Sequence, residues 1–338
     1  MSYQVLLLKK LADTGIRHLM DHGCDVIISS GKTEEDFIRD MKNCDGLFVR
    51  NEKITAHMMD MAPKLKVIAK HGIGYDNIDV EAATSRNIQV VYAPMGNVNS
   101  VAEHAIMLIL ASAKRYGVVN QEMKRGNYEI RYTLPDGYEV KNKTLGLIGC
   151  GNIAKALARK AYFGLDMRVI GYDPYQKPGF NEAGIEILES REEVLRRSDF
   201  ISIHLPSTNA TKNSFGMAEF KQMKPTAYLI NTSRGDIVIE EELVKALKQG
   251  IIKGAGLDVY DTEPVSVENP LLSMPNVIAT PHSAGMTVEA SDALSLTGAQ
   301  GIVEALYGKK ITWPVNRILV DKDEVIQYNE YEINRQRR

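Results

Sequence analysis

The strongest constraint on the fold is a regular alternation of short apolar runs with segments of helical periodicity. The alternation runs through the first part of the chain, stops near residue 100 and starts again after residue 140. Short, continuous apolar runs separated by helices are typical of strands that are buried on both faces of a parallel sheet. Two such series predict two doubly wound α/β domains, which suits a chain of 338 residues.

The alternation places most of the strands. In the first series we predict strands over Val5–Leu8, Val26–Ser29, Gly46–Val49, Lys66–Ala69 and Gln89–Ala93. In the second series we predict strands over Thr144–Ile148, Arg168–Tyr172, Phe200–His204, Tyr228–Thr232, Gly254–Val259 and Val277–Thr280. Helical periodicity indicates helices over Thr33–Lys42 and Val80–Arg86.

Two longer helical segments suggest how the domains are connected. Asn99 and Ser100 are candidate N-caps of a helix over Val101–Val119, and a second helix is predicted over Thr287–Tyr307. We expect these helices to be the crossings between the domains, which makes the N-terminal domain discontinuous. The expected division is a substrate domain over 1–100 and 285–318, a second domain over 101–284, and a polar tail over 319–338.

Charge and composition argue against several classes of partner. The chain has 41 Lys and Arg against 43 Asp and Glu, a net charge of −2, whereas nucleic-acid and membrane surfaces require a clustered basic excess. The most apolar stretch, Ala105–Ala113, is too short to span a bilayer. Cys24, Cys44 and Cys150 are widely spaced and do not have the spacing of metal ligands. We therefore expect a cytoplasmic protein without a metal site.

A glycine-rich turn follows the first strand of the second series. Residues 144–154 read TLGLIGCGNIA, an apolar strand followed by a turn and a helix. In such a turn Gly149 permits the tight bend, Gly151 leaves room for a pyrophosphate, and the small Ala154 lets helix and strand approach each other. The N–H groups at the start of the helix favour phosphate charge. The segment therefore predicts a dinucleotide site.

The identity of the dinucleotide is indicated by Asp173, which ends the next predicted strand in VIGYDPY. A carboxylate at this place accepts hydrogen bonds from the ribose hydroxyls of NAD and repels the 2′-phosphate of NADP. No arginine follows within the next few residues to bind that phosphate. The sequence therefore predicts NAD as the cofactor.

Three chemically complementary residues follow three successive strands of the second series. They are Arg234, Glu263 and His282, and the carboxyl ends of strands are where α/β sheets bind ligands. Oxidation of a 2-hydroxy acid needs a base, a carboxylate that orients the base, and a guanidinium that pairs with the substrate carboxylate. His282, Glu263 and Arg234 match these three roles in that order.

Several motifs make the chain similar to a known family over nearly its whole length. They are HGIGYDNID (His71–Asp79), NSVAEH (Asn99–His104), TLGLIGCGNIA, HLPSTNAT (His204–Thr211), NTSRGDIV (Asn231–Val238), GAGLDVYDTEP (Gly254–Pro264) and PHSAG (Pro281–Gly285). With these motifs the chain resembles the D-isomer-specific 2-hydroxyacid dehydrogenase family. The expected fold is an NAD-binding Rossmann domain inserted into a discontinuous, flavodoxin-like substrate domain.

The resemblance implies roles for individual residues and for the assembly. Arg234, Glu263 and His282 correspond to the catalytic residues of the family, and the backbone amides of Ile73 and Gly74 to its site for the substrate carboxylate. A homodimer built on the cofactor domain is also implied. Further contacts to NAD are implied for Asn152, Ile153, Asp173, Pro206, Thr211, Thr232, Ser233, Arg234, Asp258, His282, Ala284 and Gly285, beside Gly149 and Gly151.

The substrate and one alternative function remain open at this stage. Arg50 and Lys70 are candidates to bind a phosphate group, which makes 3-phosphoglycerate one candidate substrate, while hydroxypyruvate, glyoxylate and a bulkier keto acid remain open. One branch of the family consists of NAD-sensing corepressors, and the catalytic groups do not exclude such an interaction protein. Formate dehydrogenases have Gln at the position of Glu263 and phosphonate dehydrogenases have Lys at that of Ile73, so both activities are disfavoured.

Overall fold

The structure, a computed structural model, describes residues 2–318 of the chain and divides into two compact units. Among the described residues, unit 1 contains 2–97 and 286–318, and unit 2 contains Val98–Gly285. The polar tail expected over residues 319–338 lies outside the described residues. Each unit is an α/β sandwich with its own sheet, as the two series of apolar runs predicted.

Unit 1 has a five-stranded parallel sheet. Its strands have the order β2-β1-β3-β4-β5, a flavodoxin-like arrangement in which the order reverses between β1 and β3. All five expected strands are present, with slightly shifted ends: β1 Tyr3–Leu7, β2 Cys24–Ile28, β3 Gly46–Val49, β4 Val67–Lys70 and β5 Gln89–Val91.

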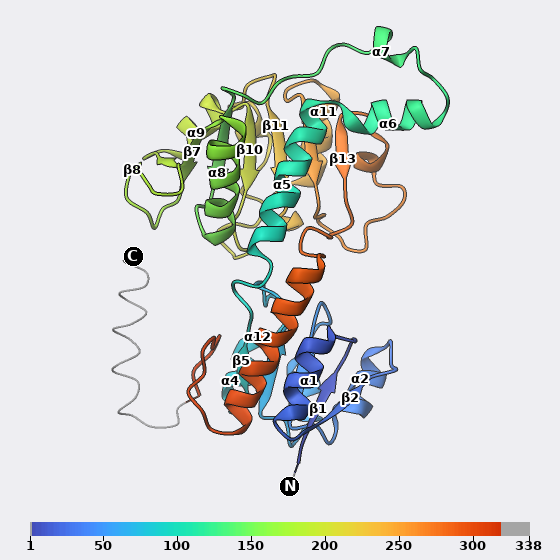
Figure 1. Cartoon of the computed structure of the whole chain (residues 1–338), viewed down its shortest axis with the longest axis vertical. Coiled ribbons are helices and arrows are strands. Elements are labelled where there is room, and N and C mark those ends of the chain that lie inside the picture. The colour runs from blue at the N-terminus through green and yellow to red at the C-terminus, as the bar shows by residue number, and fades with distance from the viewer. Residues whose placement is uncertain (1, 319–338) are drawn as a thin grey trace. The chain divides into compact units, whose positions relative to one another are not determined.

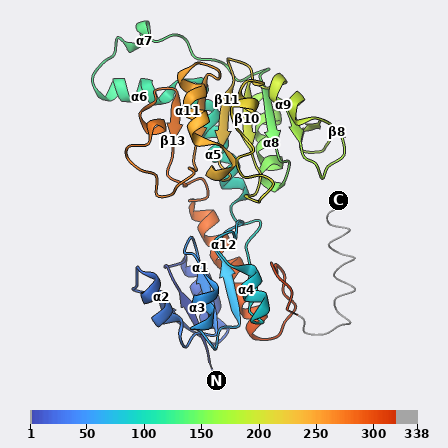
Figure 2. The same ribbon diagram turned by 180° about the vertical axis from the view of Figure 1, so that it is seen from behind.

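Helices cover both faces of the unit 1 sheet (Figures 1 and 2). Because side chains alternate along a strand, neighbouring residues of β3 enter different cores: Leu47 packs in one apolar cluster and Phe48 in the other. Helices α1 (Asp13–Asp21) and α12 (Val288–Leu306) cover one face, and α2 (Glu34–Met41), α3 (Ala56–Asp60) and α4 (Val80–Ser85) cover the other.

Helix α12 confirms the helix predicted over Thr287–Tyr307, with these two residues as its caps. The hydroxyl of Thr287 accepts a hydrogen bond from the backbone N–H of Ala290 at 3.2 Å. The helix lies so close to the sheet that a Cβ atom added to Gly298 would come within 2.3 Å of the ring of Phe48.

Unit 2 has an eight-stranded sheet of order β13-β12-β11-β10-β6-β7-β9-β8. The six expected strands are present, whereas β8 and β9 have two residues each and were too short to produce a periodic signal. Strand β8 runs antiparallel to β9, so the sheet is not parallel throughout. The strands are β6 Thr144–Ile148, β7 Arg168–Tyr172, β8 Gly179–Phe180, β9 Glu186–Ile187, β10 Phe200–Ile203, β11 Tyr228–Asn231, β12 Gly254–Leu257 and β13 Val277–Ala279.

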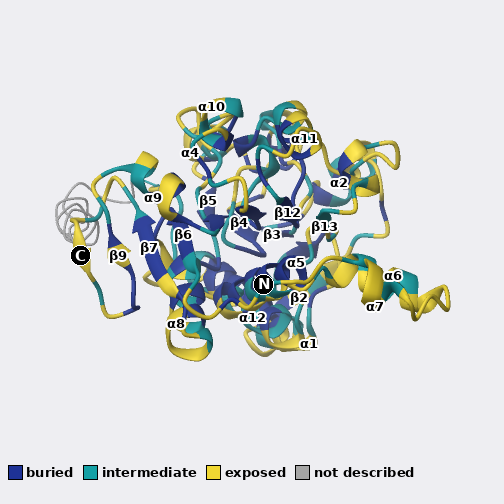
Figure 3. Ribbon diagram, turned by 90° about the horizontal axis from the view of Figure 1, so that it is seen from above, coloured by how far each residue is buried: buried dark blue, intermediate teal, exposed yellow. Residues whose placement is uncertain are grey.

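Two groups of helices enclose the unit 2 sheet, which is buried between them, while the segment that carries α6 and α7 is exposed (Figures 1 and 3). On one face lie α5 (Val98–Ala113) and α8 (Asn152–Leu165). The remaining elements are α6 Tyr116–Lys124, α7 Ile130–Thr133, α9 Arg191–Arg197, α10 Met217–Phe220, α11 Glu240–Lys248 and the 3₁₀ turns Gly235–Ile237 and Pro270–Ser273.

The helix predicted over Val101–Val119 was wrong at both ends. Helix α5 starts at Val98, so the expected caps Asn99 and Ser100 lie within its first turn. It ends at Ala113, and Arg115 has a left-handed backbone with φ 54° before α6 begins.

Contacts that are distant in sequence end α5. The backbone N–H of Tyr138 donates to the carbonyl oxygen of Ala113 at 2.9 Å. Gly137 lies so near that an added Cβ would be 2.7 Å from the same oxygen. The returning chain thus takes the place of the next helical turn, which a local apolar pattern could not reveal.

Candidate active site

The glycine-rich turn between β6 and α8 has the geometry of a phosphate-binding turn. Gly149 has φ +86°, and a Cβ there would lie 2.6 Å from the carbonyl oxygen of His204, so only glycine fits. In contrast, a Cβ on Gly151 would meet nothing within 4 Å, which shows that the space in front of it is open. Ala154 is fully buried against the sheet, as its small side chain predicted.

The residues present at this turn fit a dinucleotide. The first backbone N–H groups of a helix have no partner within it, and in α8 the bond from the N–H of Lys155 to the oxygen of Gly151 closes the first turn. The amides of Asn152 and Ile153 therefore lie at the positive end of α8, next to the open space. Strand β6 is also where the strand order reverses, between β7 and β10.

Asp173 is anchored beside this turn. One carboxylate oxygen accepts from the N–H of Cys150 and the other from the N–H of Tyr175, both at 2.9 Å. A carboxylate has further lone pairs, which remain for ribose hydroxyls. The side chain of Cys150 is buried, and burial, followed by the charge of Asp173, raises the pKa of its thiol to about 12. Cys150 is therefore an inert filler of the turn.

The loop that follows β10 is closed by its own hydrogen bonds. The hydroxyl of Thr211 donates to the carbonyl oxygen of Pro206 at 2.6 Å and accepts from the N–H of Thr208 at 2.8 Å. The hydroxyl of Ser207 donates to Asp236 at 2.6 Å. Of the two residues assigned to NAD here, Thr211 thus shapes the loop and Pro206 is exposed at its start.

The segment after β11 presents Arg234 and a buried hydroxyl. The Ser233 hydroxyl donates to the Asn231 side chain at 2.8 Å, and a guanidinium nitrogen of Arg234 donates to the carbonyl oxygen of Ser233 at 2.8 Å. The hydroxyl oxygen of Thr232 is buried and has no hydrogen-bond partner within the described part of the chain. Buried polar atoms are rarely left unpaired, so Thr232 is suited to contact a polar group of a bound cofactor.

Glu263 and His282 form a hydrogen-bonded pair. The Nδ1 atom of His282 lies 2.6 Å from Oε2 of Glu263, and the other carboxylate oxygen accepts from the N–H of Tyr260 at 3.1 Å. Because a carboxylate only accepts hydrogen bonds, Nδ1 carries the proton that the pair shares. The other ring nitrogen, Nε2, does not bind Glu263.

The surroundings of Glu263 keep it ionised. Burial by itself would raise the pKa of the carboxyl group, but the hydrogen bond and charge of His282, the Tyr260 amide and the charge of Arg234 outweigh it. The pKa of Glu263 is therefore lowered. Both side chains are still partly exposed, 41% for His282 and 35% for Glu263, so solvent can reach the pair.

Asp258 builds the turn that carries His282. It is fully buried, and its backbone oxygen accepts from the N–H of His282 at 2.7 Å. Its carboxylate accepts from the N–H groups of Ser283 at 2.9 Å and Ala284 at 2.8 Å, and from the Thr280 hydroxyl at 2.6 Å. This holds His282 in its left-handed conformation, φ 52°. The family resemblance implies only an NAD contact for Asp258, and the motif gives no signal for this role in the turn.

His104 supports the same turn from α5. Its Nε2 atom lies 2.9 Å from the hydroxyl of Thr280, and burial lowers the pKa of His104 although the charge of Asp258 opposes it. The last predicted residue of this region, Gly285, directly follows the turn at the end of unit 2.

The three proposed catalytic residues lie at one edge of the unit 2 sheet. Arg234, Glu263 and His282 follow β11, β12 and β13, which are adjacent and parallel. The turn after Arg234 touches the loop before Glu263: a Cβ on Gly235 would lie only 1.9 Å from the backbone of Tyr260. The edge carries a cation, a carboxylate and an imidazole together with the phosphate-binding turn.

The expected substrate residues of unit 1 follow β3 and β4. Ile73 and Gly74 are half-buried in the loop after β4, and Arg50 is half-buried after β3. Lys70 differs from expectation because its side chain is buried. Its ammonium donates to the carbonyl oxygen of Arg50 and, at 2.9 Å, to the side chain of Asn77. Lys70 thus joins the two loops, which leaves Arg50 as the proposed contact for a substrate phosphate.

Two further observations concern the rest of the described chain. A hollow of about 510 Å³ lies at the opposite edge of the unit 2 sheet, near Thr144 and Arg168, and none of the candidate residues lines it.

Within residues 2–318, no group of His, Cys, Asp or Glu side chains is arranged to hold a metal ion, and no helix is long and apolar enough to cross a membrane.

Comparison with known proteins decides the family. Residues 106–284 match the family model described as "D-isomer specific 2-hydroxyacid dehydrogenase, NAD binding domain". The chain belongs to this family. Its unit 2 therefore contains an NAD-binding domain, and NAD is the cofactor, in agreement with the glycine-rich turn and Asp173.

Relatives in this family match most of the chain. The D-3-phosphoglycerate dehydrogenase of Archaeoglobus fulgidus is 36% identical over 93% of the chain, but the chain spans only 59% of that protein. Glyoxylate/hydroxypyruvate reductase B of Shigella boydii is 35% identical over 91% of the chain and 96% of that protein. The crystal structure of the TT0316 protein from Thermus thermophilus has a TM-score of 0.86 and 31% identity, covering 93% of this chain and all of that one.

Proposed function

We propose that the protein is an NAD-dependent oxidoreductase that interconverts small D-2-hydroxy acids and 2-keto acids. The observation that carries this proposal is the contact of 2.6 Å between Glu263 and His282, placed beside Arg234 at the carboxyl edge of the NAD-binding unit. This set contains a proton donor, a carboxylate that orients it and a cation for an anionic substrate. The names of the relatives, which are dehydrogenases and reductases of such acids, support it.

Each residue has a distinct role in this proposal. Bound NADH supplies the hydride for reduction of a keto acid. The charged imidazole of His282 donates a proton from Nε2 to the substrate oxygen, and Glu263 stabilises that charge through Nδ1. In the opposite direction the neutral ring accepts the hydroxyl proton. Arg234 pairs with the substrate carboxylate. In unit 1, the backbone amides of Ile73 and Gly74 are the proposed contacts for a substrate carboxylate.

The candidate substrates are D-3-phosphoglycerate, hydroxypyruvate and glyoxylate. Hydroxypyruvate and glyoxylate are 2-keto acids, whereas D-3-phosphoglycerate is a 2-hydroxy acid that yields a 2-keto acid on oxidation. The three differ in size and in the presence of a phosphate group. The names of the relatives include both a D-3-phosphoglycerate dehydrogenase and a glyoxylate/hydroxypyruvate reductase. Arg50, half-buried after β3, is the proposed phosphate contact.

The proposal is tested by turnover of a panel of 2-keto acids, followed by NADH absorbance. We expect activity with at least one of these substrates, and a loss of about 10²–10⁴-fold in turnover in His282→Ala, with NADH binding retained. His57→Ala, which changes an exposed histidine of α3, serves as the matched control. Binding of NADH without turnover of any keto acid would instead favour the corepressor-like function.

We also propose a homodimer in the cytoplasm. The segment that carries α6 and α7 exposes the large side chains of Tyr116, Met123, Tyr128 and Tyr132, with exposed fractions of 58%, 55%, 56% and 70%. Such a concentration of exposed apolar area favours a protein interface. The three cysteines are free and buried, which suits a reducing compartment. Sedimentation velocity of wild type and Tyr132→Asp tests the dimer: an unchanged monomer in both contradicts it.

A further inference from the structure

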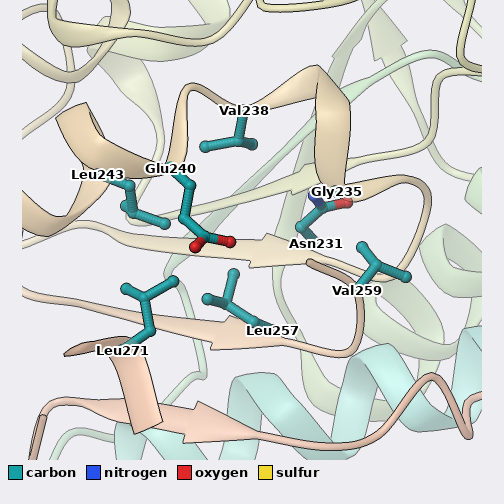
Figure 4. Close-up of a pocket in the computed structure, with 8 residues that line it drawn as sticks. All are labelled: Asn231, Gly235, Val238, Glu240, Leu243, Leu257, Val259 and Leu271. Atoms are coloured by element: carbon teal, nitrogen blue, oxygen red, sulfur yellow. The ribbon is translucent and has the colours of Figure 1, made fainter. Parts of the chain in front are cut away.

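The loop that carries Glu263 is held by a second carboxylate, that of Glu240. Glu240 is the first residue of α11 and lines a narrow pocket between the segment after β11 and strand β12 (Figure 4). The close-up shows its carboxylate directed into this pocket, next to Leu257 and between Leu243 and Asn231. A carboxylate turned toward apolar neighbours requires hydrogen-bond partners there.

Its two oxygens contact both ends of one segment. Oε1 accepts from the side-chain amide of Asn269 at 2.7 Å, and Oε2 accepts from the backbone N–H of Asp261 at 3.3 Å. Asn269 in turn accepts from the N–H of Leu271 at 2.9 Å, at the start of the following 3₁₀ turn. Residues 261–269 therefore form a loop closed by Glu240, and Glu263 lies within it.

The carboxylates of Glu263 and Glu240 accept hydrogen bonds from two consecutive backbone amides. The N–H of Tyr260 donates to Glu263 at 3.1 Å, and the N–H of Asp261, the next residue, donates to Glu240. The same backbone is pressed against Gly235, whose added Cβ would lie 2.5 Å from the nitrogen of Asp261. A displacement of this backbone thus moves the carboxylate that contacts His282.

An acidic residue in the first turn of a helix is by itself common, because it compensates the helix dipole. Helix α11 has three of them, Glu240, Glu241 and Glu242. Glu241 is exposed, and Glu242 accepts from the N–H of Met217. Glu240 differs from both in contacting the Glu263 loop, so the helix dipole does not account for its placement.

We propose that Glu240 is a positioning residue that holds the 261–269 loop so that Glu263 stays in contact with His282. The expected effect on the rate rests on the proposed function. The expected effect on the Glu263–His282 contact does not. Without Glu240, the loop loses its closure and the Glu263–His282 contact lengthens. A misplacement of 1 Å in a catalytic group costs about 10²-fold in rate, so a partial loosening costs at least about tenfold.

The structural consequence is measured by proton NMR of the 338-residue chain. A short hydrogen bond from imidazole to carboxylate moves the Nδ1 proton resonance downfield, and His282→Gln assigns the signal. We expect the signal in wild type and in Glu241→Gln, the matched control on the same helix, and its loss in Glu240→Ala. Its retention in Glu240→Ala overturns the proposal, whatever the activity. Its absence in wild type contradicts the pair itself, and with it the proposal.

The catalytic consequence is measured by a double-mutant cycle with an accepted keto acid. We expect Glu240→Ala to lower kcat at least about tenfold, to change the KM for NADH little, and to move the pH midpoint of reduction in the same direction as Glu263→Gln. Glu240→Gln, which retains an acceptor for Asn269, should have a smaller effect. In the Glu263→Gln background, Glu240→Ala should add almost nothing.

The two measurements separate the inference from the proposed function. If the effects of Glu240→Ala and Glu263→Gln on kcat add fully, Glu240 has a merely structural role and the proposal is overturned. An unchanged pH midpoint of reduction in Glu240→Ala has the same consequence. A wild type that shows the downfield signal but reduces no keto acid contradicts the proposed function, while loss of that signal in Glu240→Ala still supports positioning by Glu240.

Discussion

Glu263 shows how one side chain depends on its immediate neighbours. Burial alone would raise the pKa of its carboxyl group, whereas His282, the Tyr260 amide and Arg234 lower it. A lowered carboxyl pKa means that the negative charge, and the stabilisation it brings to the folded state, is present at neutral pH. That stabilisation is lost only as the pH falls through the lowered value. The partner of His282 is thus charged over the whole range in which an imidazole ordinarily titrates.

Glu263→Gln removes this charge while keeping the shape of the side chain. A neutral partner stabilises the protonated ring less, so keto-acid reduction should fade at lower pH than in wild type. Oxidation of the hydroxy acid, which needs the neutral ring, should then begin at lower pH. Rates in both directions from acidic to alkaline pH measure the midpoint. Glu268→Gln, an exposed change in the same loop, is the control, and an unmoved midpoint contradicts the assigned pair.

Asp173 is predicted to enforce the preference for NAD. Asp173→Asn removes the charge that repels the 2′-phosphate of NADP, while its amide oxygen still accepts from the N–H of Cys150. The ratio of kcat/KM with NADH to that with NADPH should therefore fall, chiefly through a gain with NADPH. Glu182→Gln, an exposed change in the same unit, should leave the ratio unchanged. Equal use of both cofactors by wild type contradicts the prediction.

At the scale of elements, two loops of unit 1 are connected by Lys70. Its ammonium and the side chain of Asn77 both bind the backbone around Arg50, and Asn77 also donates to the carbonyl oxygen of Glu52 at 2.6 Å. The loop after β3 is thus held by residues of β4 and of the segment that follows it. This arrangement leaves the guanidinium of Arg50, rather than the buried Lys70, as the proposed group for a substrate phosphate.

Arg50→Ala should distinguish phosphorylated from simple substrates. A charge-assisted hydrogen bond contributes about 1.5–3 kcal/mol, which corresponds to a rise of about ten- to a hundredfold in KM for a phosphorylated acid. The KM for glyoxylate should change far less. Lys53→Ala, at an exposed position nearby, serves as the control. An unchanged ratio of the two KM values shows that Arg50 does not contact a phosphate.

Helix α12 is predicted to tolerate no side chain at Gly298. By helix propensity alone, Gly→Ala stabilises a helix by about 1 kcal/mol. Here the added methyl group would lie 2.3 Å from the ring of Phe48, and overpacking of this kind costs about 1–3 kcal/mol. Gly298→Ala should therefore lower the thermal midpoint, followed by circular dichroism. Gly164→Ala in α8, where a Cβ meets nothing within 4 Å, should raise it or leave it unchanged.

At the scale of the whole molecule, unit 1 contains a buried histidine that opposes folding in acid. Burial, followed by the charge of Arg50, lowers the pKa of His71 to about 4 from 6.5, and its ring contacts the hydroxyl of Ser295 at 3.2 Å. Between these two pH values the unfolded chain binds a proton that the folded chain does not. The free energy of unfolding should therefore fall as the pH falls through this window.

The size of this effect can be checked with the single tryptophan, Trp313, which lies in unit 1. From pH 7 to pH 5 His71 should cost about 2 kcal/mol of stability in urea unfolding followed by Trp fluorescence. In His71→Gln the free energy of unfolding should fall less between pH 7 and pH 5, by that same amount. This holds whatever the stability of the variant at neutral pH. Equal slopes in the two proteins contradict the prediction.

Much of the architecture was determined by the local sequence. Buried parallel strands read as continuous apolar runs, so the strands of both sheets with three or more residues were visible, whereas the two-residue β8 and β9 were not. Gly149, Asp173, Arg234, Glu263 and His282 could be singled out because their types and their places after strands follow from the chemistry of phosphate binding and proton transfer.

Tertiary structure decided what depends on contacts between distant residues. The end of α5 depends on Tyr138, and the burial of Lys70 depends on the backbone of Arg50. The supporting roles of Asp258 and Glu240 appear only when loops from different strands are brought together. Apolar periodicity indicates which side of an element is buried. A hydrogen bond between two loops produces no periodic pattern in the sequence. The sequence therefore determined the strands and the reactive groups, and packing determined which residues hold those groups in place.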